Sequence, residues 1–213
     1  MNLRYAVMIK KFSAILIVLA AVSLLLTGCG SSGQSVAPAT ADENMLSGIY
    51  CAEITIRDYG TVRFEMDAAK APATVTNFVT LADSGFYDGL TFHRIIEGFM
   101  MQGGDPSGNG TGGADKTIKG EFSKNGFKND QSHTRGAVSM ARSSDMNSAS
   151  SQFFIVQKDS KYLDGQYACF GYVTEGMDVV DAICQNTPVI DSNGTVSSEN
   201  QPIIEKITIS KLG

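Results

Sequence analysis

The sequence contains no tryptophan, only two histidines and only four cysteines among 213 residues. So few scattered nitrogen and sulfur ligands do not build a structural zinc module, and we expect no metal site. Basic residues are also few, with 17 Lys and Arg against 22 Asp and Glu and a formal net charge of −5. This charge excludes nucleic-acid binding through a broad basic surface. The hydrophobic share of 43% and the charged share of 18% exclude a disordered acidic chain or a collagen-like one.

Several signatures of enzyme chemistry are also missing. The sequence has no G-x-S-x-G and no H-E-x-x-H pattern, and His93 and His133 lie far apart. The segment 108–113 does match G-x-G-x-x-G, but no apolar strand precedes it and no amphipathic helix follows. We interpret it as a loop built from glycine, not a nucleotide site, and expect no cofactor. A Ser/His hydrolase stays open, because such residues assemble across a fold.

The N-terminal segment predicts export. Three basic residues precede an uncharged stretch over 12–26, which is shorter than the roughly 20 residues of a membrane-spanning helix. The stretch ends in Leu26-Thr27-Gly28-Cys29, which resembles a bacterial lipobox. We therefore predict a lipoprotein signal peptide over 1–28 and lipid attachment at Cys29. The alternatives are a generic signal peptide and an uncleaved anchor.

Cleavage before Cys29 changes the charge of the working protein. The removed segment carries three basic residues and no acidic ones, which leaves a net charge of −8. The lipid, not the surface charge, would then hold the protein at a membrane. Residues 29–44 are rich in Ser, Gly, Ala, Thr and Pro, so we predict a lipidated Cys followed by a flexible tether. We predict that residues 45–213 form one domain. We expect an extracytoplasmic monomer anchored to the bacterial cell membrane.

Apolar periodicity in the domain predicts short strands and two helices. Alternation over 50–57 and 61–66 indicates a β-hairpin, and a helix begins at Pro72 and ends near Gly85. Residues 177–184 predict a second helix. Six further apolar runs, giving eight strands in all, indicate a mainly β fold that is a closed barrel or a sandwich. These runs are 91–95, 99–101, 137–141, 153–156, 168–173 and 203–210.

The cysteines that follow the lipobox do not suggest a disulfide framework. Three cysteines remain, Cys51, Cys169 and Cys184, and an odd number cannot all form disulfides with one another. No C-x-x-C motif is present. Cys51 and Cys169 lie in apolar strand-like segments, where a buried free thiol is common. We favour structural thiols over a disulfide.

One long motif is specific enough to suggest a family. The segment 92–105 reads F-H-R-I-I-E-G-F-M-M-Q-G-G-D, and N-G-T-G-G, S-M-A, S-Q-F-F-I and L-D-G follow at 109, 139, 151 and 163. In these motifs the sequence resembles the cyclophilins, a family of peptidyl-prolyl cis/trans isomerases. The resemblance covers about residues 48–213. It implies a closed eight-stranded antiparallel β-barrel capped by two α-helices, which agrees with the strand count.

The resemblance also implies roles for individual residues. It places the catalytic arginine at Arg94, with Gln102 beside it, and the backbone around Ala141 and Arg142 at the polar rim of the substrate site. It implies a proline pocket formed by Phe99, Met100, Phe154 and Leu163.

Three positions depart from the best-known relatives and bear on substrate preference. Tyr167 replaces a histidine that most members have, Arg142 replaces an asparagine, and Tyr162 replaces a tryptophan. An indole at the last position supports cyclosporin binding in sensitive relatives, so we expect weak cyclosporin binding here. All three residues are expected to border the substrate.

Two functions from different classes follow. The first is an isomerase that acts on proline-containing peptides and unfolded exported proteins. The second is a binding module or chaperone with a cyclophilin fold and little isomerase activity. Retention of Arg94 favours the first, because binding a ground-state peptide does not require it.

Overall fold

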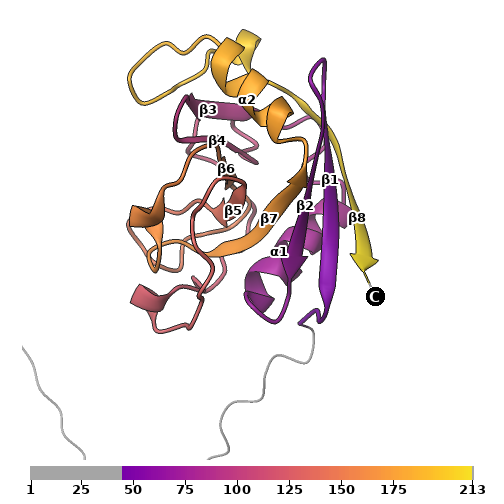
Figure 1. Ribbon diagram of the computed structural model, residues 1–213, viewed down its shortest axis with the longest axis vertical. Helices are drawn as coiled ribbons and strands as arrows, with labels where there is room; N and C mark the ends of the chain where they lie inside the picture. The colour runs from indigo at the N-terminus through magenta and orange to yellow at the C-terminus, as the bar shows by residue number, and fades with distance from the viewer. Residues whose placement is uncertain (1–44, 213) are drawn as a thin grey trace, which may run out of the picture. The chain divides into compact units, whose positions relative to one another are not determined.

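The strands and helices follow the order that the apolar pattern predicts (Figure 1). The structure is a computed structural model that describes residues 45–212; the predicted signal peptide, Cys29 and the entire predicted tether lie outside these residues. The helices are α1 (Pro72–Asp83) and α2 (Met177–Asn186). The strands are β1 (Ile49–Ile56), β2 (Gly60–Asp67), β3 (Phe92–Ile96), β4 (Met100–Gly103), β5 (Ala137–Met140), β6 (Phe153–Val156), β7 (Cys169–Glu175) and β8 (Ile204–Leu212).

The eight strands form one antiparallel sheet in the order β3-β4-β6-β5-β7-β2-β1-β8. The sheet curls into a half-barrel, which confirms the predicted mainly β architecture with two helices. Its end strands are joined by single contacts and not by a ladder. An isolated bridge links Thr91 to Ile203, and the N–H of Phe92 donates to the carbonyl of Pro202 at 2.9 Å. The two edges of the half-barrel are therefore held together at the starts of β3 and β8, by residues 89–92 and 202–204.

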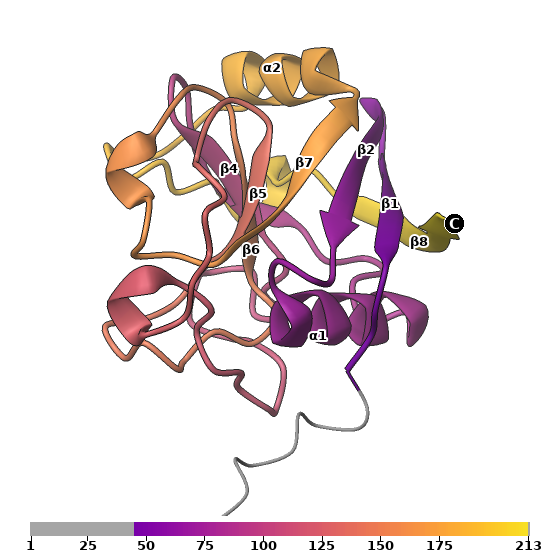
Figure 2. The same cartoon turned by 60° about the horizontal axis from the view of Figure 1, so that its bottom comes forward.

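The two helices lie at opposite ends of the curled sheet, as Figure 2 shows. Pro72 opens α1 as predicted, and the helix buries Val75, Phe78, Val79 and Ala82 together with Thr74. Because these positions recur every three or four residues, they form one stripe that packs on the sheet. Helix α2 buries Val180, Ile183 and Cys184 and extends two residues beyond the predicted end.

Aromatic rings fill the centre of the main core. The ring of Phe78 from α1 packs against Phe64, Phe153 and Phe170, with centroid distances of 5.5, 5.4 and 5.3 Å. All four side chains are fully buried. Rings at these separations add edge and offset contacts to the burial of apolar area. They attach α1 to strands β2, β6 and β7.

A buried carboxylate stabilises the start of α1. The residue before the helix, Ala71, offers no side-chain cap. Instead Glu121, only 3% exposed, accepts hydrogen bonds from the backbone N–H groups of Ala73 at 2.9 Å and Thr74 at 2.8 Å, and from the Thr74 hydroxyl at 2.7 Å. Free N–H groups and the positive end of the helix dipole make this an anion-binding position. The long loop before β5 is thereby fixed to α1.

The three cysteines of the described residues, Cys51, Cys169 and Cys184, are free and buried, as predicted. Burial raises the pKa of Cys169 to about 12 and that of Cys184 to about 12. Across residues 45–212 no helix combines the length and the apolar composition that a membrane crossing requires.

Replacing Glu121 should weaken the whole fold. We expect Glu121→Ala to lower the free energy of unfolding by about 2–4 kcal/mol, because two buried donors of Thr74 and the half-buried N–H of Ala73 lose a charged acceptor. Glu121→Gln keeps one oxygen acceptor and should cost less. Urea denaturation measures both, with the exposed Glu205→Ala as a control expected within about 0.5 kcal/mol of the parent. Equal stability of Glu121→Ala and Glu205→Ala would contradict the capping role.

Candidate active site

Strands β3, β4 and β6 bring three key side chains into one row. Arg94 lies opposite Gln102 in the β3–β4 ladder, and Gln102 lies opposite Phe154 in the β4–β6 ladder. Directly opposed residues share one face of a sheet, so the three side chains point the same way. Met101, the next residue along β4, belongs to the main core on the other face. Met100 belongs to the pocket side, so neighbouring methionines point to opposite faces as strand alternation requires.

This row borders a pocket of about 210 Å³ that faces away from the main core. One side of the pocket is apolar, and the other side presents two guanidinium groups and an amide. Of the ten residues predicted for the site, the structure brings nine together here. They are Arg94, Phe99, Met100, Gln102, Ala141, Arg142, Phe154, Leu163 and Tyr167.

The tenth predicted residue, Tyr162, does not line this pocket. Its side chain is 65% exposed, and its ring packs against Phe99 with a centroid distance of 5.9 Å. It lies on the short helical turn Lys161–Leu163, where Leu163 points inward and Tyr162 outward. Tyr162 could therefore contact only a part of the substrate peptide that lies outside this pocket.

Arg94 is held by neutral acceptors. Its Nη1 donates to Oε1 of Gln102 at 3.2 Å, and its Nε donates to the carbonyl of Asn193 at 2.8 Å. Burial lowers the pKa of Arg94, yet a guanidinium remains charged at any physiological pH. Among the described residues no carboxylate lies within 4.0 Å of it. The pocket therefore contains a positive charge that no carboxylate contacts directly, while the more distant Asp191 favours the charged form.

The amide of Gln102 is oriented by a second amide. Its Nε2 donates to Oε1 of Gln152 at 2.9 Å, and Nε2 of Gln152 donates to the carbonyl of Gly112 at 2.7 Å. With its nitrogen used in this way, Gln102 turns its oxygen toward Arg94. The chain of hydrogen bonds connects the arginine to the glycine-rich loop.

The glycine-rich loop is organised by an internal carboxylate. Asp105, which is 1% exposed, accepts backbone N–H groups of Ser107, Asn109 and Gly110 at 2.7, 3.1 and 2.6 Å. Burial raises the pKa of this carboxyl, but the bonds from these N–H groups and that of Gly112 outweigh burial and hold it below its ordinary value. The backbone N–H groups that would have to bind a phosphate are thus already bonded to Asp105. The structure supports the interpretation of 108–113 as a loop.

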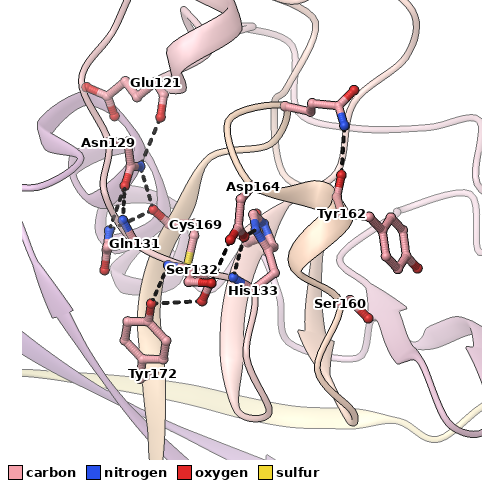
Figure 3. A network of polar contacts seen from close by, with 12 residues as sticks. Glu121, Asn129, Gln131, Ser132, His133, Ser160, Tyr162, Asp164, Cys169 and Tyr172 are labelled. Atoms are coloured by element: carbon pink, nitrogen blue, oxygen red, sulfur yellow. Dashed lines mark hydrogen bonds and ion pairs between the residues drawn. The ribbon is translucent and has the colours of Figure 1, made fainter.

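His133 is the residue that sequence reasoning missed. It lies in the loop before β5 and is fully buried. Its ring stacks on Phe154, with centroids 6.0 Å apart and planes at 17°. Its Nδ1 lies 2.8 Å from Oδ1 of Asp164, and its Nε2 lies 3.0 Å from the hydroxyl of Ser139 (Figure 3 shows the Asp164 side). His133 therefore supports the ring that forms one wall of the pocket.

These three residues have the connectivity of a hydrolase triad but not its accessibility. Ser139 lies within β5 and is completely buried, as is the imidazole of His133. A nucleophile must reach the carbonyl of its substrate, and this hydroxyl faces packed side chains. The Ser/His hydrolase that the sequence left open is not supported.

The segment that carries His133 is fixed to β7 by side chains drawn in Figure 3. Asn129 and Gln131 each donate to the carbonyl of Cys169 at 2.8 Å. The hydroxyl of Tyr172 accepts the N–H of Ser132 at 2.8 Å and donates to the carbonyl of the same residue at 2.9 Å. Such a network positions the imidazole without regular secondary structure.

The other histidine, His93, is also buried. It occupies the irregular step between Phe92 and Arg94 in the β3–β4 ladder and is 4% exposed. Neither ring nitrogen has a hydrogen-bond partner among the described residues. Burial lowers the pKa of both His93 and His133. Among residues 45–212 no three His, Cys, Asp or Glu side chains form a group suited to a metal.

Known proteins similar to this chain share one description. A family model for "cyclophilin type peptidyl-prolyl cis-trans isomerase/CLD" matches residues 51–213. Peptidyl-prolyl cis-trans isomerase B of Bacillus subtilis is 43% identical over 144 residues, covering 68% of this chain and 92% of the relative. A Helicobacter pylori peptidyl-prolyl cis-trans isomerase is 46% identical over 128 residues, covering 59% and 76%. A Cryptosporidium parvum cyclophilin-type isomerase, crystallised in the presence of the dipeptide Ala-Pro, is 31% identical with a TM-score of 0.66, covering 76% and 99%.

The two buried histidines should make the fold less stable in mild acid. An unfolded histidine has a pKa of about 6.5. Because folding lowers the pKa of both, the unfolded chain binds more protons below that pH, and stability falls as the pH falls from 7.5 to 5.5. Each histidine contributes a slope of at most about 1.4 kcal/mol per pH unit. Urea denaturation at several pH values measures it.

The chain has only these two histidines, which provides a complete control. His93→Gln and His133→Gln should each reduce the pH dependence of the unfolding free energy, and the double variant should abolish it between pH 7.5 and 5.5. An undiminished slope in the double variant would assign the effect to other groups.

Proposed function

The chain belongs to the cyclophilin-type peptidyl-prolyl cis-trans isomerases, and from this premise we propose that it is a lipid-anchored isomerase of exported proteins. It is an enzyme that accelerates rotation about X–Pro bonds. The single observation that supports our assignment of the site is the unneutralised guanidinium of Arg94 beside an apolar pocket.

Resonance in the peptide bond creates the barrier that the enzyme lowers. Rotation must break this resonance, at a cost of about 18–20 kcal/mol, so X–Pro bonds relax over tens to hundreds of seconds. In the twisted state the prolyl nitrogen regains a lone pair that the planar amide lacks. A donor placed at that nitrogen stabilises the transition state more than the ground state.

In the mechanism we propose, Arg94 is the donor to that nitrogen. Its guanidinium is already oriented by Gln102 and the carbonyl of Asn193, so little reorganisation accompanies the twist. Phe99, Met100, Phe154 and Leu163 hold the proline ring and exclude water, which strengthens the electrostatic interaction. Gln102 and the backbone of Ala141 hold the residue before the proline while the bond rotates.

The alternative of a binding module without catalysis receives less support from the site. Binding a planar proline peptide needs the apolar wall but no buried charge, and burying a charge costs free energy. A structure that keeps Arg94 half-buried and without a carboxylate partner favours catalysis.

The exported setting rests on the sequence before the domain. Basic residues, an uncharged stretch and Leu26-Thr27-Gly28-Cys29 occur in that order, and the family match begins only at residue 51. Sixteen residues over 29–44 would span up to about 55 Å if fully extended. A domain on such a tether could reach proline-containing segments of newly exported chains near the membrane.

Replacing Arg94 tests the mechanism. We expect Arg94→Ala to lower kcat/KM by about 10²-fold or more, or about 2.7 kcal/mol of barrier, because the twisted bond loses its donor. A protease-coupled assay with a proline peptide and the full chain in mild detergent measures it. Arg57→Ala, an exposed arginine paired with Glu205, is the matched control and should keep full activity. Unchanged activity in Arg94→Ala would refute the mechanism, and an inactive parent would favour the binding module.

Replacing Cys29 tests the anchor. Without a thiol no thioether to lipid forms, so Cys29→Ser should abolish metabolic labelling with palmitate and release the protein from the membrane fraction. Ser35→Ala, a change in the predicted tether, should leave both unaffected. Normal membrane fractionation of Cys29→Ser would refute the lipoprotein assignment and leave the isomerase assignment standing.

A further inference from the structure

A second cavity adjoins the proline pocket and differs from it in chemistry. Its volume is about 220 Å³, and it shares Gln102, Ala141 and Arg142 with the first pocket. Hydroxyl groups, glycine backbone and one amide line the remainder, contributed by Gly110, Thr111, Gly112, Ser143, Ser148, Ser150 and Gln152. No aromatic or large aliphatic side chain is among these residues, so the cavity suits a polar group.

Arg142 provides positive charge to this cavity. The described residues include five arginines, and Arg57, Arg63 and Arg135 each lie within 4.0 Å of a carboxylate. Arg94 and Arg142, the two that border the proline pocket, do not. In a chain with a net charge of −5, carboxylates are available to pair with both. The lack of partners is therefore specific to this surface.

The guanidinium of Arg142 is fixed in place but not saturated. Its Nε and Nη2 donate to the carbonyl of Gln166 at 3.0 and 2.8 Å, and its Nη1 donates to the carbonyl of Ser143 at 2.8 Å. The rings of Phe122 and Tyr167 lie 5.1 and 4.7 Å from its central carbon. A guanidinium has five N–H groups, so the three bonds leave two without an acceptor. A pre-oriented, partly free guanidinium matches the geometry of a carboxylate.

Two aspartates of the protein lie near the cavity, but neither provides a carboxylate to the free N–H groups of Arg142. The carboxylate of Asp105 is buried and bonded to backbone N–H groups beneath the glycine-rich loop. The carboxylate of Asp145, in the turn 143–148, accepts the N–H of Asn147 at 2.9 Å. Neither residue lines the cavity.

We infer that this cavity selects substrates with an acidic side chain two residues before the proline, through Arg142. The inference rests on the proposed function of the neighbouring pocket. In an extended peptide, alternate side chains point to the same side. With the proline in the first pocket and the preceding residue held at Gln102 and Ala141, the side chain one position earlier points toward the second cavity. Asp or Glu there would accept the free N–H groups of Arg142, with hydroxyl donors around it.

The test compares peptides that differ only two residues before the proline. Peptides of the form Gly-X-Ala-Pro-Phe-Gly, blocked at both ends and with X as Glu, Gln or Lys, are assayed with the full chain by NMR exchange spectroscopy. We expect kcat/KM for Glu to exceed that for Gln by about fivefold, the size expected of one partly exposed charge-assisted contact. Lys should be the poorest substrate. The preference should shrink at 1 M NaCl, because salt screens the ion pair.

Variants are compared by the ratio of kcat/KM for the Glu peptide to kcat/KM for the Gln peptide. A smaller fraction of folded enzyme lowers both values equally and leaves this ratio unchanged. Arg142→Gln should reduce the ratio to about one, and Arg142→Lys should restore part of it. Arg57→Gln removes the same charge from a distant surface and should keep the full ratio, which controls for long-range electrostatics.

The outcomes separate this inference from the proposed function. Activity on all peptides with a Glu-to-Gln ratio near one in the parent, or an unchanged ratio in Arg142→Gln, would overturn the inference alone. A stronger preference for Glu directly before the proline would also overturn it, because that side chain points away from the second cavity. Absence of activity on every peptide would instead refute the isomerase function itself.

Discussion

The candidate active site depends on burial of both faces of the β4–β6 ladder. On one face Met101, Phe153 and Ile155 lie in the main core; on the other, Met100 and Phe154 form the pocket wall. A slip of one residue in this pairing would exchange the two sets and place Gln102 in the core. The aromatic core around Phe78 therefore also sets the register that aligns the pocket. Stability and site geometry follow from the same strand alternation.

The charge of Arg94 is usable because its neighbours are neutral. An adjacent carboxylate would hold the guanidinium more tightly, but it would also cancel the field in the pocket. An amide and a backbone carbonyl orient the group and leave its charge free. The cost is partial desolvation, which is reflected in the lowered pKa of Arg94. Favourable contacts elsewhere, such as those of Glu121 with α1, offset that cost in the fold as a whole.

Local sequence patterns predicted the strands and helices. They could not reveal which residues far apart in the sequence contact one another. The helix at Pro72 and the hairpin before it follow from periodicity, because burial of alternate or every third to fourth residue depends on neighbours in the chain. The residues of the pocket were predicted only through resemblance to the cyclophilins. His133 and Glu121 were missed because their contacts are with residues 31 and 47 positions away, and a single polar residue in a loop carries no periodic signal. The exposed position of Tyr162 was missed for a related reason, since a short helical turn follows no alternation.

The buried thiols have a consequence for where such a domain can fold. With a pKa of about 12, Cys169 and Cys184 are almost entirely protonated at neutral pH, and only the thiolate attacks a disulfide or reacts with an oxidant. The described fold also contains no disulfide that must form first. The native state thus requires no oxidation step, and once it has formed its buried thiols resist oxidants. The domain therefore needs no thiol oxidase to reach this structure.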